Sequence, residues 1–193
     1  MTALRSATAE RHAELDTRTP LAAAAPDLRA YRDHLHLLEA WLAPLQPLLA
    51  RHDDGARHGL PARDYLSLIR ADLAHPALAG LPPAPALASA PWPPLDDEAY
   101  RWGVAYVMEG SQLGGAVLYK RLAARLAPHP LAYLRGTGAP GPRWQQFLAA
   151  LRGAVTSERQ IGQACAGARQ AFDRLIALVD RLNSSSAQPA GRP

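Results

Sequence analysis

The chain has 193 residues, a net charge of +4 and a single cysteine. That length suits one domain, and 40 alanines with 30 leucines against only eight valines and isoleucines favour helices over a sheet. A single cysteine cannot form an internal disulfide or a cysteine-ligated metal cage. The lack of disulfides is typical of proteins in a reducing, cytoplasmic compartment. The arginines are spread along the chain, whereas a nucleic-acid interface needs them clustered, so nucleic acid is not an expected partner.

Three helices are predicted in the first third of the chain. The first covers Thr2–Asp16, where apolar and small residues recur at steps of three and four. Its start carries charges every few positions and no apolar core, so we expect no export signal. Asp27 is predicted to cap a second helix that Pro44 and Pro47 kink or end, and a third is expected over about 62–74.

A proline-rich connector separates these helices from the rest of the chain. Residues 76–95 hold seven prolines and are predicted to cross the surface without helical structure. A long helix is then expected from Asp96 towards Pro128, followed by a short one around Trp144 and a last one from about Ile161. We therefore predict one all-α domain of six or seven helices over residues 1–183, with a disordered tail over 184–193.

Four glycines lie inside the predicted long helix, at positions 103, 110, 114 and 115. Together they cost about 3–4 kcal/mol of helix stability relative to alanine, which calls for a compensating gain. At 100° per residue, Gly103, Gly110 and Gly114 lie within about 40° of one another, so they are expected to form one smooth groove. Three occupants remain open: a close-packed soluble helix, a flat ligand, or a membrane partner helix, the last disfavoured by Glu109 and Lys120.

His12 is the second unusual residue, because the spacing places it on the inward face of the first helix. A lone inward histidine is more often a hydrogen-bonded core residue than a ligand. Here Asp16 lies one turn further on, where its carboxylate can hold the ring of a metal-bound imidazole, and Arg5 lies close to the same face, where it can meet a ligand carboxylate. Since haem iron needs only one axial histidine and space opposite, these features together predict a haem site.

Two segments carry a specific resemblance. The residues 4–16, LRSATAERHAELD, and the residues 106–120, YVMEGSQLGGAVLYK, resemble the two haem-sandwiching helices of the heme oxygenase family. The likeness is greatest to the bacterial biliverdin-producing branch that includes enzymes accompanying bacteriophytochromes. Tyr133-Leu134 and the run from Trp144 to Leu148 are also similar to that branch.

The resemblance implies a haem sandwiched between the first helix and the glycine-rich helix. It implies His12 as the proximal iron ligand, and Gly110, Ser111 and Gly114 as the catalytic distal surface. The other haem-binding positions that we assign on this basis are Arg5, Thr8, Asp16, Tyr106, Leu113, Lys120 and Phe172.

The implied reaction converts haem, which is substrate and cofactor at once, to biliverdin, CO and ferrous iron. It consumes O₂ and electrons from an external ferredoxin or reductase, because the chain has no dinucleotide or flavin motif of its own. A bacteriophytochrome is a further expected partner, as acceptor of the biliverdin, and no membrane association is expected.

The chain departs from the family pattern at two places. Ser111 stands where mammalian-type members have an aspartate that organises water, and Ala105 stands where some members direct a tyrosine at a propionate. Arg5, with Lys120 as a second candidate, is therefore expected to do more of the anchoring. A cation at Arg5 favours cleavage at the α-meso position.

Alternative functions remain open at this point. A haem-binding or haem-transfer protein of the same fold would use His12 without turnover. A thiaminase-like relative would need a nucleophilic cysteine, but Cys165 lies on the apolar stripe of the last helix and reads as an inert buried thiol. A di-iron oxidase would need Glu-x-x-His motifs, which the chain lacks, and a plain helical interaction module is the remaining option.

Overall fold

The computed structural model describes residues 2–187, and within this range the chain is helical, with no strand. The α-helices are α1 (Thr2–Arg18), α2 (Leu28–His52), α3 (Tyr65–Leu73), α4 (Glu98–Leu122), α5 (Ala132–Arg135), α6 (Pro140–Ala154) and α7 (Glu158–Ala187). Short 3₁₀ helices, η1 (Pro20–Ala22), η2 (Ala56–His58) and η3 (Pro76–Leu78), lie in the connections. The all-α prediction is confirmed.

Aspartates begin three of the helices. Asp27, Asp64 and Asp97 each accept a hydrogen bond from the backbone N–H three residues on, at 2.8, 3.0 and 2.8 Å, so each satisfies one of the free donors of a helix start. The prediction that Asp27 caps the second helix is confirmed. Asp97 is the cap of α4, which therefore begins at Glu98, with acidic charge at the positive end of the helix dipole.

α2 does not end at its prolines, which corrects one boundary. The helix runs through Pro44 and Pro47 to His52. Leu42 and Leu45, on either side of Pro44, are buried almost completely. Burial of this apolar stripe outweighs the hydrogen bonds that two prolines remove, because tertiary packing supplies most of the stability of a helix.

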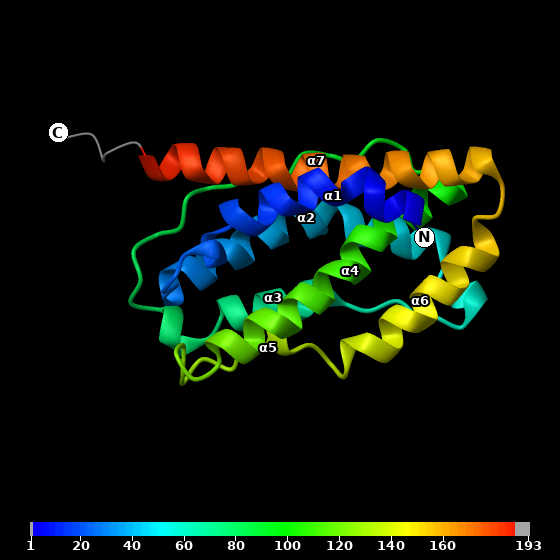
Figure 1. Ribbon diagram of the computed structural model, residues 1–193. Helices are drawn as coiled ribbons and strands as arrows, with labels where there is room; N and C mark the ends of the chain where they lie inside the picture. Colours follow the sequence, from blue (N-terminus) through cyan, green and yellow to red (C-terminus); the bar gives the residue numbers. More distant parts are fainter. Residues whose placement is uncertain (1, 188–193) are drawn as a thin grey trace.

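α7 is the helix that holds α1, α2 and α4 together. It packs against α1, α2 and α4, and Figure 1 shows it along one side of the molecule with α1 and α4 both beneath it. Contacts between α4 and α7 are the most extensive in the fold. The shared support of α7 therefore sets the position of α1 relative to α4.

The connector, the end of α4 and the C-terminal tail differ in detail from the prediction. The predicted connector, residues 76–95, begins with the 3₁₀ helix η3 and is non-helical after Leu78. Trp92 within it is buried, with the Arg174 guanidinium 4.5 Å from its ring centre. α4 ends at Leu122 rather than near Pro128. α7 continues through residue 184 to Ala187, so the tail is helical over its first four residues, while residues 188–193 lie outside the described range. No helix between residues 2 and 187 is long and apolar enough to span a membrane.

One buried histidine on α2 makes stability depend on pH. The side chain of His34 is enclosed, and its Nδ1 has no hydrogen-bond partner in the structure described. Burial lowers the pKa of His34 from 6.5 to about 4. Above pH 6.5 the ring is neutral in both the folded and the unfolded chain, and between pH 6.5 and 4 only the unfolded chain takes up the proton. Folding is therefore weakened as the pH falls through that window, by up to about 1.4 kcal/mol per pH unit.

Replacing His34 by leucine is expected to remove this contribution. Urea unfolding of the wild-type chain and of His34→Leu at pH 7.5, 5.5 and 4.5 measures this contribution. It is the difference in how steeply the free energy of unfolding changes with pH. The wild-type free energy of unfolding should fall more steeply below pH 6.5 than that of the variant. Parallel curves would show that His34 takes up its proton equally in both states.

Candidate functional site

His12 lies on the edge of α1 and not on its inward face. Leu4, Thr8 and Leu15 are buried, whereas 65% of the His12 side chain is exposed, so the prediction of an inward His12 is wrong. The reason is geometric. Each step of four residues advances about 40° around a helix, so His12 lies about 80° from Leu4 and about 40° beyond Thr8, which is the edge of the buried stripe.

The His12 ring is held on one side only. Its Nδ1 lies 2.9 Å from Oδ2 of Asp16, one turn further along α1, as expected. The ring centre lies 6.0 Å from that of Phe172, a buried residue of α7. Nε2 has no hydrogen-bond partner among residues 2–187 and is free to bind a ligand. An imidazole oriented by a carboxylate through its other nitrogen is the usual arrangement of a metal-binding histidine.

Gly103, Gly110 and Gly114 of α4 do not form one groove, which corrects the second prediction. A Cβ at Gly103 would lie 1.8 Å from the carbonyl oxygen of Ala164 in α7. Facing it, a Cβ at Gly167 would lie 2.1 Å from the carbonyl oxygen of Tyr100. Gly103 therefore permits the close approach of α4 and α7. Of the three predicted occupants, a close-packed helix is the one found at this position.

Gly110 and Gly114 leave the surface of α4 open, as the flat-ligand hypothesis requires. A Cβ at Gly114 would meet nothing within 4 Å, and one at Gly110 would make only ordinary contact, 3.5 Å, with the Trp144 ring of α6. Val117 lies within about 20° of Gly110 around the helix and is 68% exposed. We call the surface formed by Gly110, Gly114 and Val117 the open α4 face. Gly115 instead points at Leu134 of α5, whose carbonyl oxygen would be 3.6 Å from a Cβ.

α1 and the open α4 face are brought together through α7. Phe172 of α7 contacts His12, while Ala164, two turns earlier in α7, contacts Gly103. The start of α1 also approaches α4: burial raises the pKa of the Tyr106 hydroxyl, and the positive charge of Arg5 opposes that shift. His12 and Phe172 thus join α1 to α7, and Figure 1 shows α1 and α4 on the same side of α7.

The other residues predicted to bind haem are less well placed to contact a ligand. Thr8 is buried and its hydroxyl donates to the Leu4 carbonyl oxygen at 2.9 Å, so it is not available to a ligand. Lys120 is exposed but lies about 80° from Gly110 around α4. Arg121 shares the side of Gly110, but its guanidinium donates to the Leu21 carbonyl oxygen. Leu113 is half-buried, about 60° from Gly110.

Ser111 belongs to a hydrogen-bonded group that the sequence analysis did not find. Its hydroxyl donates to the Met108 carbonyl oxygen at 2.7 Å and receives a weak contact from Gln112 at 3.4 Å. The Gln112 amide donates to the hydroxyl of Tyr133 in α5 at 3.1 Å. Burial raises the pKa of Tyr133, and hydrogen bonds with Ser111 and Gln112 oppose the shift. α5 thereby supplies the side chain that positions Ser111.

Trp144 is the second residue that was missed as part of the site. Its ring centre lies 5.2 Å from that of Tyr106 and 5.5 Å from that of Phe147, so an aromatic cluster borders the open α4 face on the side of α6. Arg143, next in the chain, donates to both carboxylate oxygens of Glu109 at 2.7 and 2.6 Å. This buried ion pair joins α6 to α4 immediately before Gly110 and holds Trp144 in place.

Comparison with known proteins agrees with these features. Residues 95–181, which include all of α4 and α6 and most of α7, match the family model for heme oxygenase. The chain is 39% identical over 82 residues to a heme oxygenase of Xanthomonas campestris pv. campestris, covering 42% of this chain and 50% of that protein. It is 37% identical over 89 residues to heme oxygenase PigA of Pseudomonas aeruginosa, covering 44% of this chain and 43% of that protein.

The matched segments span about half the length of these curated relatives. The family model covers the open α4 face and the α7 helix that supports it. Together with the all-helical architecture, these matches show that residues 95–181 carry a heme oxygenase family domain.

Proposed function

We propose that this chain binds haem between α1 and α4 and degrades it to biliverdin, CO and ferrous iron, with O₂ and electrons from an external donor. The observation that carries the proposal is the pair formed by His12 and the open α4 face: an imidazole whose Nδ1 is held by Asp16 and whose Nε2 is free, beside a helix that offers bare backbone. The heme oxygenase family domain supports haem as the substrate.

The residues present suit haem. A Cβ at Gly114 would project into space that nothing else occupies, so the backbone there can approach a planar ring. Val117 adds exposed apolar surface on the same side, which a hydrophobic macrocycle would cover. Arg5 has no hydrogen-bond or salt-bridge partner in the described part of the chain and can pair with a propionate.

Each residue then has a role in the proposed reaction. Bound haem supplies the iron at which O₂ is activated. His12 would hold the haem iron through Nε2, and Asp16 would fix the imidazole ring and increase its basicity. Gly110 and Gly114 would leave space for O₂, since they carry no side chain. Ser111, positioned by Tyr133 and Gln112, provides a hydroxyl that can hold a water molecule and pass a proton where other members use an aspartate.

Product isomer and partners follow the same reasoning. Arg5 on α1 favours a haem orientation that exposes the α-meso edge, so we propose α-biliverdin as the product. The electron donor is an external ferredoxin or reductase, and a bacteriophytochrome is the proposed acceptor of biliverdin. A cytoplasmic location fits these partners.

Mixing the purified chain with hemin tests the proposal. A Soret band is expected at one hemin per chain, and ascorbate in air should convert it to a green product that chromatography identifies as α-biliverdin. A stable haem complex without green product would support the non-catalytic haem carrier instead. Absence of the Soret band would refute haem binding altogether.

A further inference from the structure

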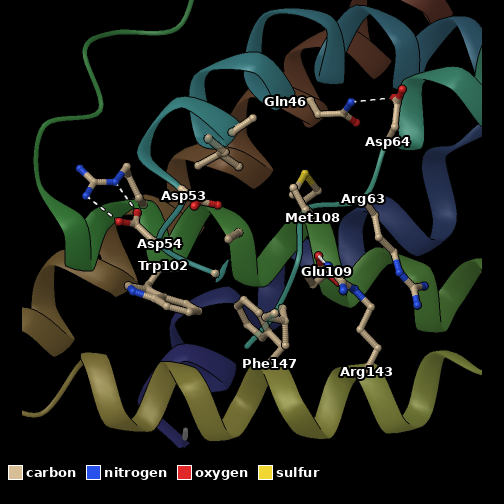
Figure 2. Close-up of a pocket in the computed structure, with 17 residues that line it drawn as sticks. Gln46, Asp53, Asp54, Arg63, Asp64, Trp102, Met108, Glu109, Arg143 and Phe147 are labelled. Carbon is tan, nitrogen blue, oxygen red and sulfur yellow. Dashed lines mark hydrogen bonds and ion pairs between the residues drawn. The ribbon is translucent and has the colours of Figure 1, made fainter. Parts of the chain in front are cut away.

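A cavity of about 340 Å³ lies on the other side of α4 from the open α4 face. It is enclosed by the C-terminal end of α2, the segment 53–64, α4 and α6. Ala105 and Met108, which line it, point about 140–160° away from Gly110 around the helix, so Ala105 does not face a propionate as the family register implied. Figure 2 shows Trp102, Met108 and Phe147 along its walls. It is therefore separate from the proposed haem site.

Two buried ion pairs form the polar parts of the wall, and both are complete. Arg101 donates to both oxygens of Asp54, at 2.5 and 3.0 Å. Arg143 donates to both oxygens of Glu109, which also accepts from the Tyr65 hydroxyl at 3.0 Å. Bidentate pairs of this kind fix the shape of the cavity but leave no charge to attract a ligand.

The polar side chains near the mouth of the cavity also contribute little binding energy to a charged ligand. Asp64 accepts from Gln46 and from the Ser67 backbone, so its charge is satisfied. The side chains of Arg63 and Asp53 have no partner among residues 2–187, but they carry opposite charges and both line the cavity. A charged ligand would meet a like charge as well as an opposite one at the mouth and would find no free counterion inside, so its desolvation would not be repaid.

The interior is apolar and has the size of a two-ring molecule. Its deeper walls are formed by the side chains of Leu49, Leu60, Trp102, Met108 and Phe147. An engineered protein cavity of about 150 Å³ holds one benzene molecule, so a cavity of this volume accommodates two fused rings. Aromatic and thioether side chains favour an aromatic occupant, through ring contacts and contacts between sulfur and the ring edge.

We propose that this cavity is a binding site for a small, uncharged, two-ring aromatic molecule. The site is independent of haem binding and of the proposed reaction. Indole is a suitable probe, since it is soluble and uncharged and contains two fused rings. Its dissociation constant is expected on the order of 0.1–1 mM, as for a small ligand held mainly by apolar contact.

Met108 gives a direct readout. With ¹³C-labelled methionine methyl groups, indole should shift the Met108 signal progressively to saturation, because the ring lies against that methyl group. Indole-3-acetate and tryptamine carry the same rings with a negative and a positive charge. Both should bind at least about tenfold more weakly than indole.

Two matched variants separate the cavity from the open α4 face. Ala105→Leu narrows the cavity beside Met108 and should abolish the Met108 shift while the hemin Soret band and helical circular dichroism stay as in the wild type. Gly114→Leu obstructs the open α4 face and should leave indole binding intact. The proposal is overturned if no saturable shift appears, if either charged analogue binds as tightly as indole, or if Gly114→Leu abolishes the shift and Ala105→Leu does not.

Discussion

Replacing His12 by alanine is expected to eliminate haem turnover and to change the absorption spectrum of the hemin complex. The reason is that Nε2 of His12 is the proposed axial nitrogen, and alanine leaves the iron without a protein ligand. Absorption spectra and biliverdin formation with ascorbate measure both effects. Added imidazole should restore part of the spectrum and of the turnover, because it can occupy the space left by the missing side chain.

A graded series distinguishes ligation from a general loss of structure. Asp16→Asn keeps the ligand but weakens the support of its ring, so a smaller loss is expected, about 10–100-fold in activity or affinity. His36→Ala is the matched control, since His36 also has a carboxylate one turn on in its own helix, Glu39 at 3.9 Å, but lies in α2. An unchanged spectrum in His12→Ala, or equal losses in His12→Ala and His36→Ala, would contradict the assignment.

Replacing Gly103 by alanine is expected to destabilise the fold by about 3 kcal/mol, which corresponds to a lowering of Tm by about 10 °C. The new Cβ would lie 1.8 Å from a backbone oxygen of α7, and backbone cannot move aside as a flexible side chain can. α4 and α7 would have to separate along the most extensive helix contact of the molecule. Thermal and urea unfolding measure this loss.

The same substitution at Gly114 is expected to have the opposite effect on stability. Since nothing lies within 4 Å of a Cβ there, alanine should raise helix stability by about 0.5–1 kcal/mol. It should nevertheless weaken hemin binding on the order of tenfold, because the added methyl group occupies the surface proposed for the ring. If Gly103→Ala is tolerated, the close approach of α4 and α7 is wrong. If Gly114→Ala binds hemin as the wild type does, the open α4 face is not the haem surface.

The local sequence was sufficient to predict most of the helices. Asp27 and Asp97 carry capping side chains, and apolar residues recur at helical spacing, so the positions of α1, α2, α4, α6 and α7 follow from short-range chemistry. The ends were less predictable: α2 passes Pro44 and α4 stops before Pro128. Those ends depend on which segments become buried, and burial is a property of the whole fold.

The candidate site also combines features that the sequence determined with features that only the fold determined. The pair His12 and Asp16 is one turn apart in a single helix, so the sequence alone determined that the carboxylate reaches the ring. Whether the ring faces the core or the surface depends on where α7 lies, and the structure places it outward. For this reason a pattern read on one helix found the histidine and its supporting carboxylate but assigned the ring to the wrong face.

The sequence by itself determined an all-α chain with helix-breaking glycines in one helix and a carboxylate-supported histidine in another. Only the tertiary structure decided that Gly103 serves the packing of α4 on α7 while Gly114 stays open, because the two positions differ in what approaches from elsewhere in the chain. It also brought Tyr133 to Ser111. Periodicity describes one helix at a time, whereas a site is made by the contacts between helices that are distant in sequence.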